Sequence, residues 1–217
     1  MYTSSHITAK RVILTSFFVD LLDIVLNVTV ALLTGSVVMV AEFFQAVADL
    51  VSSAFLWVGL KRPEKEVYLW TILSALIMLI VASSLSFYFG LRRFLHPEEV
   101  KNIFLAYAAL FVGALSNGYA FAISVKRILG GKSFFTLIKA FNNSPLIMTK
   151  NTFVLDLMGM SSALVGLMAL VLYHVFGDVR FDGLGAMGIG VILAFLSINL
   201  ILDLIALVRG KRVSREI

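Results

Sequence analysis

Six long apolar stretches dominate this chain and restrict what it can fold into. A helix rises 1.5 Å per residue, so about 20 apolar residues cross the roughly 30 Å hydrocarbon core of a bilayer. Because 60% of the 217 residues are hydrophobic and only 14% are charged, we predict an all-α membrane protein with six transmembrane helices. The predicted helices cover residues 12–33, 37–60, 68–91, 102–125, 147–173 and 184–208.

The segments outside these stretches are short, and many are basic. We predict a tail at 1–11, one transmembrane domain at 12–208, and a short basic tail at 209–217 with no C-terminal metal-binding domain. Lysine and arginine gather in the two tails and in the connections at 61–65 and 126–144. The positive-inside rule then places the N- and C-termini in the cytoplasm. The first apolar stretch is too long for a signal peptide, and without a targeting peptide we expect the cell (plasma) membrane.

Two polar pairs with the same spacing lie inside apolar stretches. Gln45 precedes Asp49 by four residues, and Thr152 precedes Asp156 by four residues. Positions i and i+4 share one face of a helix, so each pair presents two oxygen ligands side by side. An ionisable group at membrane depth costs a few kcal/mol and is by default a candidate functional residue. We predict a four-ligand cation site, with structural hydrogen bonding by the two acids as the alternative.

Further acidic residues lie in the first two predicted helices. Asp20 and Asp23 share one face of the first helix with Asn27, and Glu42 precedes Asp49 by one heptad. Asp20 and Asp23 either enlarge an oxygen site, relay protons or line a water-filled vestibule. Glu42 is interpreted as a vestibule or interface residue, with a role as an accessory ligand as the alternative. The glycines of the sixth helix, with Gly166 of the fifth, are interpreted as positions of close helix packing, namely Gly183, Gly185, Gly188 and Gly190.

The segment from Gly35 and Ser36 through Glu42 and Gln45 to Asp49 resembles the second-helix signature of the cation diffusion facilitators, which export divalent metals. The resemblance continues through Asn117, Thr152 with Asp156, Asp182, and the run at 207–210. It implies a homodimer that binds one divalent cation between the second and fifth helices and exports it, commonly against protons. Carried over by position, the ligands are Gln45, Asp49, Thr152 and Asp156.

This chain departs from the family pattern in its ligand chemistry. Zinc members usually place a histidine in one or both pairs, where this chain has Gln45 and Thr152. Tetrahedral zinc favours nitrogen and sulfur, whereas an all-oxygen set suits manganese, magnesium or iron(II) better. The transported ion is expected to be zinc, manganese, iron or cobalt, and the sequence does not rank them. The connection at 63–66 contains no histidine, in contrast to the family's histidine-bearing loop.

Several other functions are disfavoured. The chain has no cysteine, and its three histidines lie in the tail or at helix ends, so no Ser-His-Asp or Cys-His arrangement is expected. No phosphate-binding Gly-x-x-x-x-Gly-Lys loop is present, which disfavours an ATP-driven pump. We therefore predict a proton-coupled metal antiporter in the lipid bilayer, neither an enzyme nor a nucleic-acid-binding protein, without a cofactor. The alternatives are a non-transporting regulatory relative with a decayed site, or a proton-coupled carrier of a small organic cation.

Overall fold

The computed structural model describes residues 9–144 and 147–210, and the regular structure in these ranges is helical. It contains six segments long and apolar enough to cross a membrane, which confirms the predicted fold class. These segments are Ile13–Thr34, Val37–Leu60, Glu66–Leu95, Ile103–Leu129, Ile147–Phe176 and Arg180–Ala206. Most of the two predicted tails lies outside the described residues, and the cytoplasmic location of the termini stays a prediction.

The helices follow one another with short connections. In chain order they are α1 (Ala9–Thr34), α2 (Val37–Leu60), α3 (Glu64–Ile77), η1 (Met78–Ser83), α4 (Ser84–Leu95), α5 (Ile103–Leu129), η2 (Phe134–Thr136), α6 (Leu137–Asn143), α7 (Ile147–Phe176) and α8 (Arg180–Gly210).

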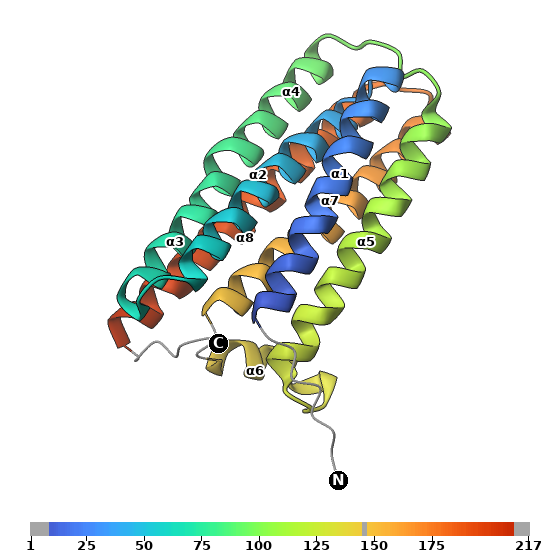
Figure 1. Cartoon of the computed structure of the whole chain (residues 1–217). Coiled ribbons are helices and arrows are strands. Elements are labelled where there is room, and N and C mark those ends of the chain that lie inside the picture. Colours follow the sequence, from blue (N-terminus) through green and yellow to red (C-terminus); the bar gives the residue numbers. More distant parts are fainter. Residues whose placement is uncertain (1–8, 145–146, 211–217) are drawn as a thin grey trace.

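The long helices run side by side along their length (Figure 1). α1 packs along α2, α5 along α7, and α4 along α8, while α2 also contacts α3, α4, α7 and α8. The short α6 lies at the end of the bundle where α5 ends and α7 begins (Figure 1). α2 is therefore the central helix, and it contains one of the two predicted polar pairs.

The third membrane span is one continuous helix with a change of hydrogen-bonding pattern in its middle. α3 and α4 are joined by η1, a π-helical segment, so the span exceeds the predicted range of 68–91 at both ends. Inserted π-helical turns widen a helix locally. η1 packs against α8 and α2 through the buried side chains of Met78 and Ala82.

Glycines bring α4 and α8 into contact backbone to backbone. A Cβ added at Gly90 would lie 2.6 Å from the Met187 nitrogen, and one at Gly183 would lie 2.7 Å from the Gly90 carbonyl oxygen. A Cβ at Gly190 would come within 2.8 Å of the Ser83 carbonyl oxygen. Small residues allow such close approach of membrane helices. The packing role predicted for these α8 glycines is confirmed, although Gly188 has more space.

A hydrogen-bonded anchor holds the start of α2 against the start of α8. Gly35, with φ +67°, makes the turn out of α1, and Ser36 is the N-cap of α2. The fully buried Asp182 of α8 accepts hydrogen bonds from Ser36 Oγ at 2.6 Å, from Val37 N at 2.8 Å and from Val38 N at 3.1 Å. Two main-chain N–H groups that a helix start leaves unpaired are thereby satisfied from another helix.

A second anchor lies at the other end of α8. Lys150 of α7 is completely buried, and its Nζ lies 2.9 Å from Asp203 Oδ2 of α8. The Lys150 Nζ also lies 4.7 Å from the centre of the Phe141 ring in α6. Asp203 is about 30 Å from Asp182 at 1.5 Å per residue. The two anchors therefore fix α8 to α2 at one end of the bundle and to α7 at the other.

Large apolar side chains cover much of the outer surface. Leu32 is 82% exposed, Phe104 74% and Phe195 65%, on α1, α5 and α8 respectively. Contiguous apolar surface of this kind is unfavourable in water but normal for helices that face lipid. The surface therefore agrees with a multi-pass integral membrane protein.

Candidate cation site

All four predicted ligands are buried inside the bundle. Gln45 and Asp49 lie on α2, and Thr152 and Asp156 lie on α7, each with at most 5% of its surface exposed. α2 and α7 pack against each other, and the carboxyl groups of Asp49 and Asp156 lie close enough to interact electrostatically. The predicted pairing of the two polar segments therefore agrees with the packing of their helices.

Asp156 is held by hydroxyl groups from two other helices. Ser16 Oγ of α1 donates to Asp156 Oδ1 at 2.7 Å, and Ser124 Oγ of α5 donates to Oδ2 at 2.7 Å. Both serines are buried. Each hydroxyl donates to a different oxygen, so the two serines together fix the orientation of this carboxyl group. α5 thus contributes a side chain to the site, which the sequence did not predict, and α1 contributes a serine in addition to the accessory acids that the sequence did suggest.

On α2, three buried acceptor atoms lack a hydrogen-bond partner among the described residues. They are Glu42 Oε1, together with Gln45 Oε1 and Asp49 Oδ1 of the predicted polar pair. Buried polar atoms are nearly always paired, and a deeply buried unpaired acceptor calls for an explanation. Two such oxygens on successive turns of one helix face are suited to a positively charged ligand.

Asp20 of α1 adds a third carboxylate to this region. It is 5% exposed, accepts a hydrogen bond from Ser53 Oγ at 2.8 Å, and lies within electrostatic reach of both Asp49 and Asp156. Acids on α1, α2 and α7 therefore converge on one interior volume. The possible accessory role that the sequence assigned to Asp20 has this geometric support.

Thr152 is less closely connected to the acids than the sequence pattern suggests. Its Oγ1 donates to the Met148 carbonyl oxygen of its own helix at 3.0 Å. Such a bond to the carbonyl four residues earlier is common for threonine inside helices. Because it uses the hydroxyl hydrogen, the Thr152 oxygen can act toward a ligand only through its lone pairs. The hydroxyl makes no described hydrogen bond to Asp49, Asp156 or Gln45.

Asp23 and Glu42 lie in a neighbouring polar region. Asn117 Nδ2 of α5 donates to Asp23 Oδ2 at 2.5 Å, and Ser116 Oγ donates to Oδ1 at 3.2 Å. Gly159 of α7 leaves the space for this amide, since an added Cβ would clash with the Asn117 side chain. Glu42 is 6% exposed, interacts with Ser162, and has one unpaired oxygen. The acids therefore extend along the bundle interior beyond the predicted site.

Within the ranges that the structure describes, no three acidic or histidine side chains form a preassembled metal centre. The carboxylates of Asp20 and Asp156 are oriented by serine hydroxyls. A cation would therefore have to draw the side chains together. Sequence reasoning did not identify Ser16, Ser53 and Ser124, because a hydroxyl in an apolar stretch is usually a helix-packing residue.

Comparison with known proteins identifies a family of cation transporters and several relatives. The family model of the cation efflux transmembrane domain matches residues 13–207. The chain is 23% identical over 211 residues to the Xenopus laevis proton-coupled zinc antiporter SLC30A9, mitochondrial, covering 88% of this chain and 37% of the relative. It is 21% identical over 201 residues to the protein of that name from Homo sapiens, with 84% and 35% covered, and 20% identical over 201 residues to the one from Mus musculus.

The chain spans little more than a third of the length of these relatives. The family match, in contrast, covers nearly the whole chain. The predicted resemblance to the cation diffusion facilitators is therefore confirmed: the chain belongs to the cation efflux family and contains its transmembrane domain.

Proposed function

We propose that this protein exports a divalent metal ion in exchange for protons, with the ion bound between α1, α2 and α7. The observation that supports this proposal is the pair of unpaired buried oxygens on Asp49 and Gln45, with the carboxyl groups of Asp20 and Asp156 within electrostatic reach of Asp49. Two carboxylates neutralise a dication, and this compensation is needed where the surroundings have a low dielectric constant. Asp49 and Asp156 supply this charge, Gln45 and Thr152 supply neutral oxygens, and Asp20 is the accessory acid.

Proton exchange follows from the same groups. When the metal leaves, the carboxylates lose their counter-ion inside an apolar bundle, where an unpaired charge is unfavourable. Taking up protons removes that charge, so metal release and proton uptake are coupled at the same oxygens. The relatives, which are described as proton-coupled zinc antiporters, support the proposed exchange of metal for protons.

The identity of the metal depends on the oxygen ligands. The relatives are described as zinc antiporters, but the proposed site contains neither histidine nor cysteine. Zinc prefers nitrogen and sulfur ligands, whereas manganese and iron(II) accept oxygen-rich sites. We propose zinc as the first ion to test because of the relatives, with manganese, iron(II) and cobalt as the competing ions. We also propose that the protein is a homodimer and that it lies in the plasma membrane. The names of the relatives, in contrast, describe them as mitochondrial.

The test is metal flux into proteoliposomes under an imposed pH gradient. Wild type is compared with Asp49→Asn, Asp156→Asn and Asp20→Asn, each of which removes a charge with little change in shape. Glu99→Gln is the matched control because Glu99 is exposed and lies outside the bundle interior. We expect saturable, proton-dependent flux that falls at least about tenfold in the Asp49 and Asp156 variants, equivalent to about 1.4 kcal/mol.

Three outcomes would contradict the proposal. Flux that persists in both the Asp49 and the Asp156 variant would exclude them as the charge-bearing ligands. Absence of flux for every ion, with folded protein, would favour the non-transporting regulatory alternative. Flux of a small organic cation that metals do not compete with would favour the organic-cation carrier.

A further inference from the structure

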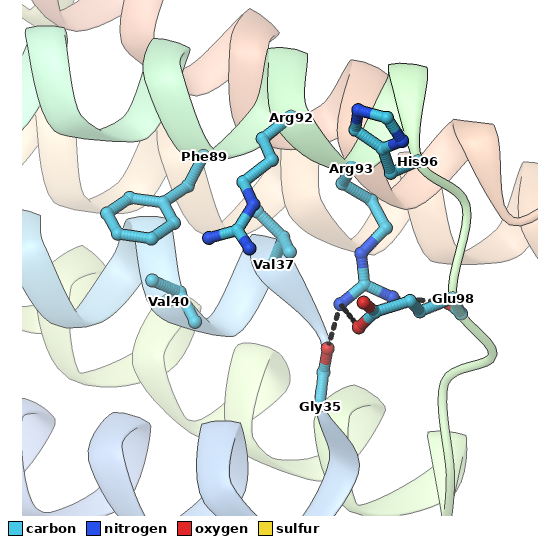
Figure 2. A pocket seen from close by; sticks show the side chains of 8 residues that line it. All are labelled: Gly35, Val37, Val40, Phe89, Arg92, Arg93, His96 and Glu98. Atoms are coloured by element: carbon cyan, nitrogen blue, oxygen red, sulfur yellow. Dashed lines mark hydrogen bonds and ion pairs between the residues drawn. The ribbon is translucent and has the colours of Figure 1, made fainter.

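A cavity of about 590 Å³ lies between the start of α2 and the end of α4, outside the candidate cation site. Its walls are partly apolar, from Val37, Val40 and Phe89, and partly basic, from Arg92 and Arg93 (Figure 2). Cavities of this size are typical of sites for small molecules, and a mixed apolar and cationic lining selects amphiphilic anions.

Arg93 has a structural role in this cavity. It is 7% exposed, and its guanidinium donates to the Gly35 carbonyl oxygen at 2.6 Å and to the Glu98 carbonyl oxygen. The Glu98 carboxylate also lies 3.8 Å from Arg93. Figure 2 shows these interactions at the turn between α1 and α2. The charges of Arg93 and Glu98 therefore offset each other, and the contacts of Arg93 join the α1–α2 turn to the segment that follows α4.

Arg92 has no such partner. Its side chain is exposed and extends along the cavity toward Phe89 and Val37 (Figure 2), without a hydrogen bond or ion pair to any described residue. The N–H groups at the start of α2 already bind Asp182, so the helix terminus does not supply the anion site. Among the charged residues that line the cavity, Arg93 is paired with Glu98, so the remaining positive charge is that of Arg92, whose guanidinium is free to bind a ligand.

The surroundings of Arg92 are those of a lipid-facing helix. Its neighbours Tyr88 and Leu91 on α4 are exposed, and Phe89 stacks on Phe44 of α2 with ring centres 5.4 Å apart. Aromatic side chains near the ends of membrane-spanning helices are typical of the boundary between headgroups and acyl chains. A ligand bound here would have its charged group at Arg92 and its apolar part against Val40 and Phe89.

We propose that this cavity binds the phosphate group of an anionic phospholipid. Arg92 pairs with the phosphate through two parallel N–H donors, a geometry that guanidinium provides and an ammonium group does not. His96 also lines the cavity. Basic pockets between membrane helices are known to accept lipid headgroups. The bound lipid would connect α2 to α4 beside the anchor formed by Asp182.

The test uses the purified full chain in neutral detergent, with phosphatidylglycerol, phosphatidylcholine or inorganic phosphate added. Lipid binding is followed by native mass spectrometry and by the melting temperature. Arg92→Gln is compared with Arg180→Gln, an exposed arginine at the start of α8 that does not line the cavity. We expect Arg92→Gln to weaken phosphatidylglycerol binding about tenfold or more, the effect of losing a charge-assisted hydrogen bond, and Arg180→Gln to leave it within about twofold.

Arg92→Lys keeps the positive charge but loses the two parallel N–H donors, so it should retain only part of the phosphatidylglycerol binding. The melting temperatures without lipid verify that each variant folds. Equal binding of phosphatidylglycerol and phosphatidylcholine, or equal losses in the two glutamine variants, would overturn the proposal. Inorganic phosphate that produces the same shift would indicate a free-anion site. If Arg92→Gln instead separates dimers, the occupant of the cavity is a second copy of the chain, and the lipid proposal fails.

Discussion

Replacement of Asp182 by alanine should be among the most destabilising single changes outside the candidate cation site. Its carboxylate is fully buried and accepts hydrogen bonds from Ser36 Oγ, Val37 N and Val38 N. The guanidinium of Arg93 also lies within electrostatic reach. Truncation removes the acceptor for all three donors and the counter-charge for Arg93 in one step.

The expected loss follows from the three donors left without an acceptor. A buried unpaired donor costs about 1–3 kcal/mol in water-soluble proteins, whereas hydrogen bonds between membrane helices average about 0.6 kcal/mol. Three donors therefore give a lower figure of about 2 kcal/mol, and we expect about 3 kcal/mol because the acceptor is charged and two of the donors are main-chain groups that cannot turn away. Asp182→Asn keeps one carbonyl oxygen and should lose about half as much.

The free energy of unfolding is measured by titration with denaturing detergent in mixed micelles, with the fluorescence of Trp57 and Trp70 as the signal. Asp178→Ala is the matched control, since Asp178 lies in the connection just before α8 but is exposed, and its carboxylate accepts one hydrogen bond, from Arg180 N at 2.9 Å. Its loss should stay below about 1 kcal/mol. An Asp182→Ala variant that unfolds like Asp178→Ala would refute the view that Asp182 anchors α2.

Three further predictions concern other contacts. Gly90→Ala should destabilise the protein by at least about 2 kcal/mol because the new methyl group meets the α8 backbone. Gly118→Ala is the control, since there is space for a methyl group at Gly118, and thermal unfolding should distinguish the two variants. Asp203→Ala should cost about 1–3 kcal/mol because it leaves the Lys150 charge buried, and adding Lys150→Met should recover most of this loss in a double-mutant cycle. Asp23→Asn should alter the pH dependence of metal flux without abolishing it, and an unchanged rate and pH profile would remove Asp23 from the proton path.

The six-helix fold could be predicted from the sequence because a bilayer leaves few alternatives. Each main-chain polar group must be paired within the membrane, so an apolar stretch of sufficient length becomes a helix. The π-helical segment at Met78–Ser83 was not predictable in this way, since it depends on how α3 and α4 fit against α8. The glycine positions of α8 did indicate close packing, but they did not identify α4 as the partner helix.

The candidate site could be predicted only in part. The spacing of Asp49 and Asp156 within apolar stretches correctly indicated two buried acids on neighbouring helices. The sequence did not show that Thr152 donates to its own helix, because that hydroxyl has several acceptors within reach. Nor did it show that Ser16 and Ser124 would meet Asp156, since contacts across 140 and 32 residues depend on tertiary packing.

The two kinds of helix contact in this bundle differ in how readily they rearrange. Where Gly90 and Gly183 meet, backbone touches backbone, and displacement of either helix produces a clash. Around Asp156, in contrast, Ser16 and Ser124 hold the carboxylate through hydroxyl hydrogens that rotate without backbone movement. A cation that approaches Asp156 competes for the oxygens these hydroxyls now bind, and each rotation turns a lone pair toward the ion. We therefore expect ion binding to begin with side-chain rotation on α1 and α5, while α4 and α8 keep their spacing.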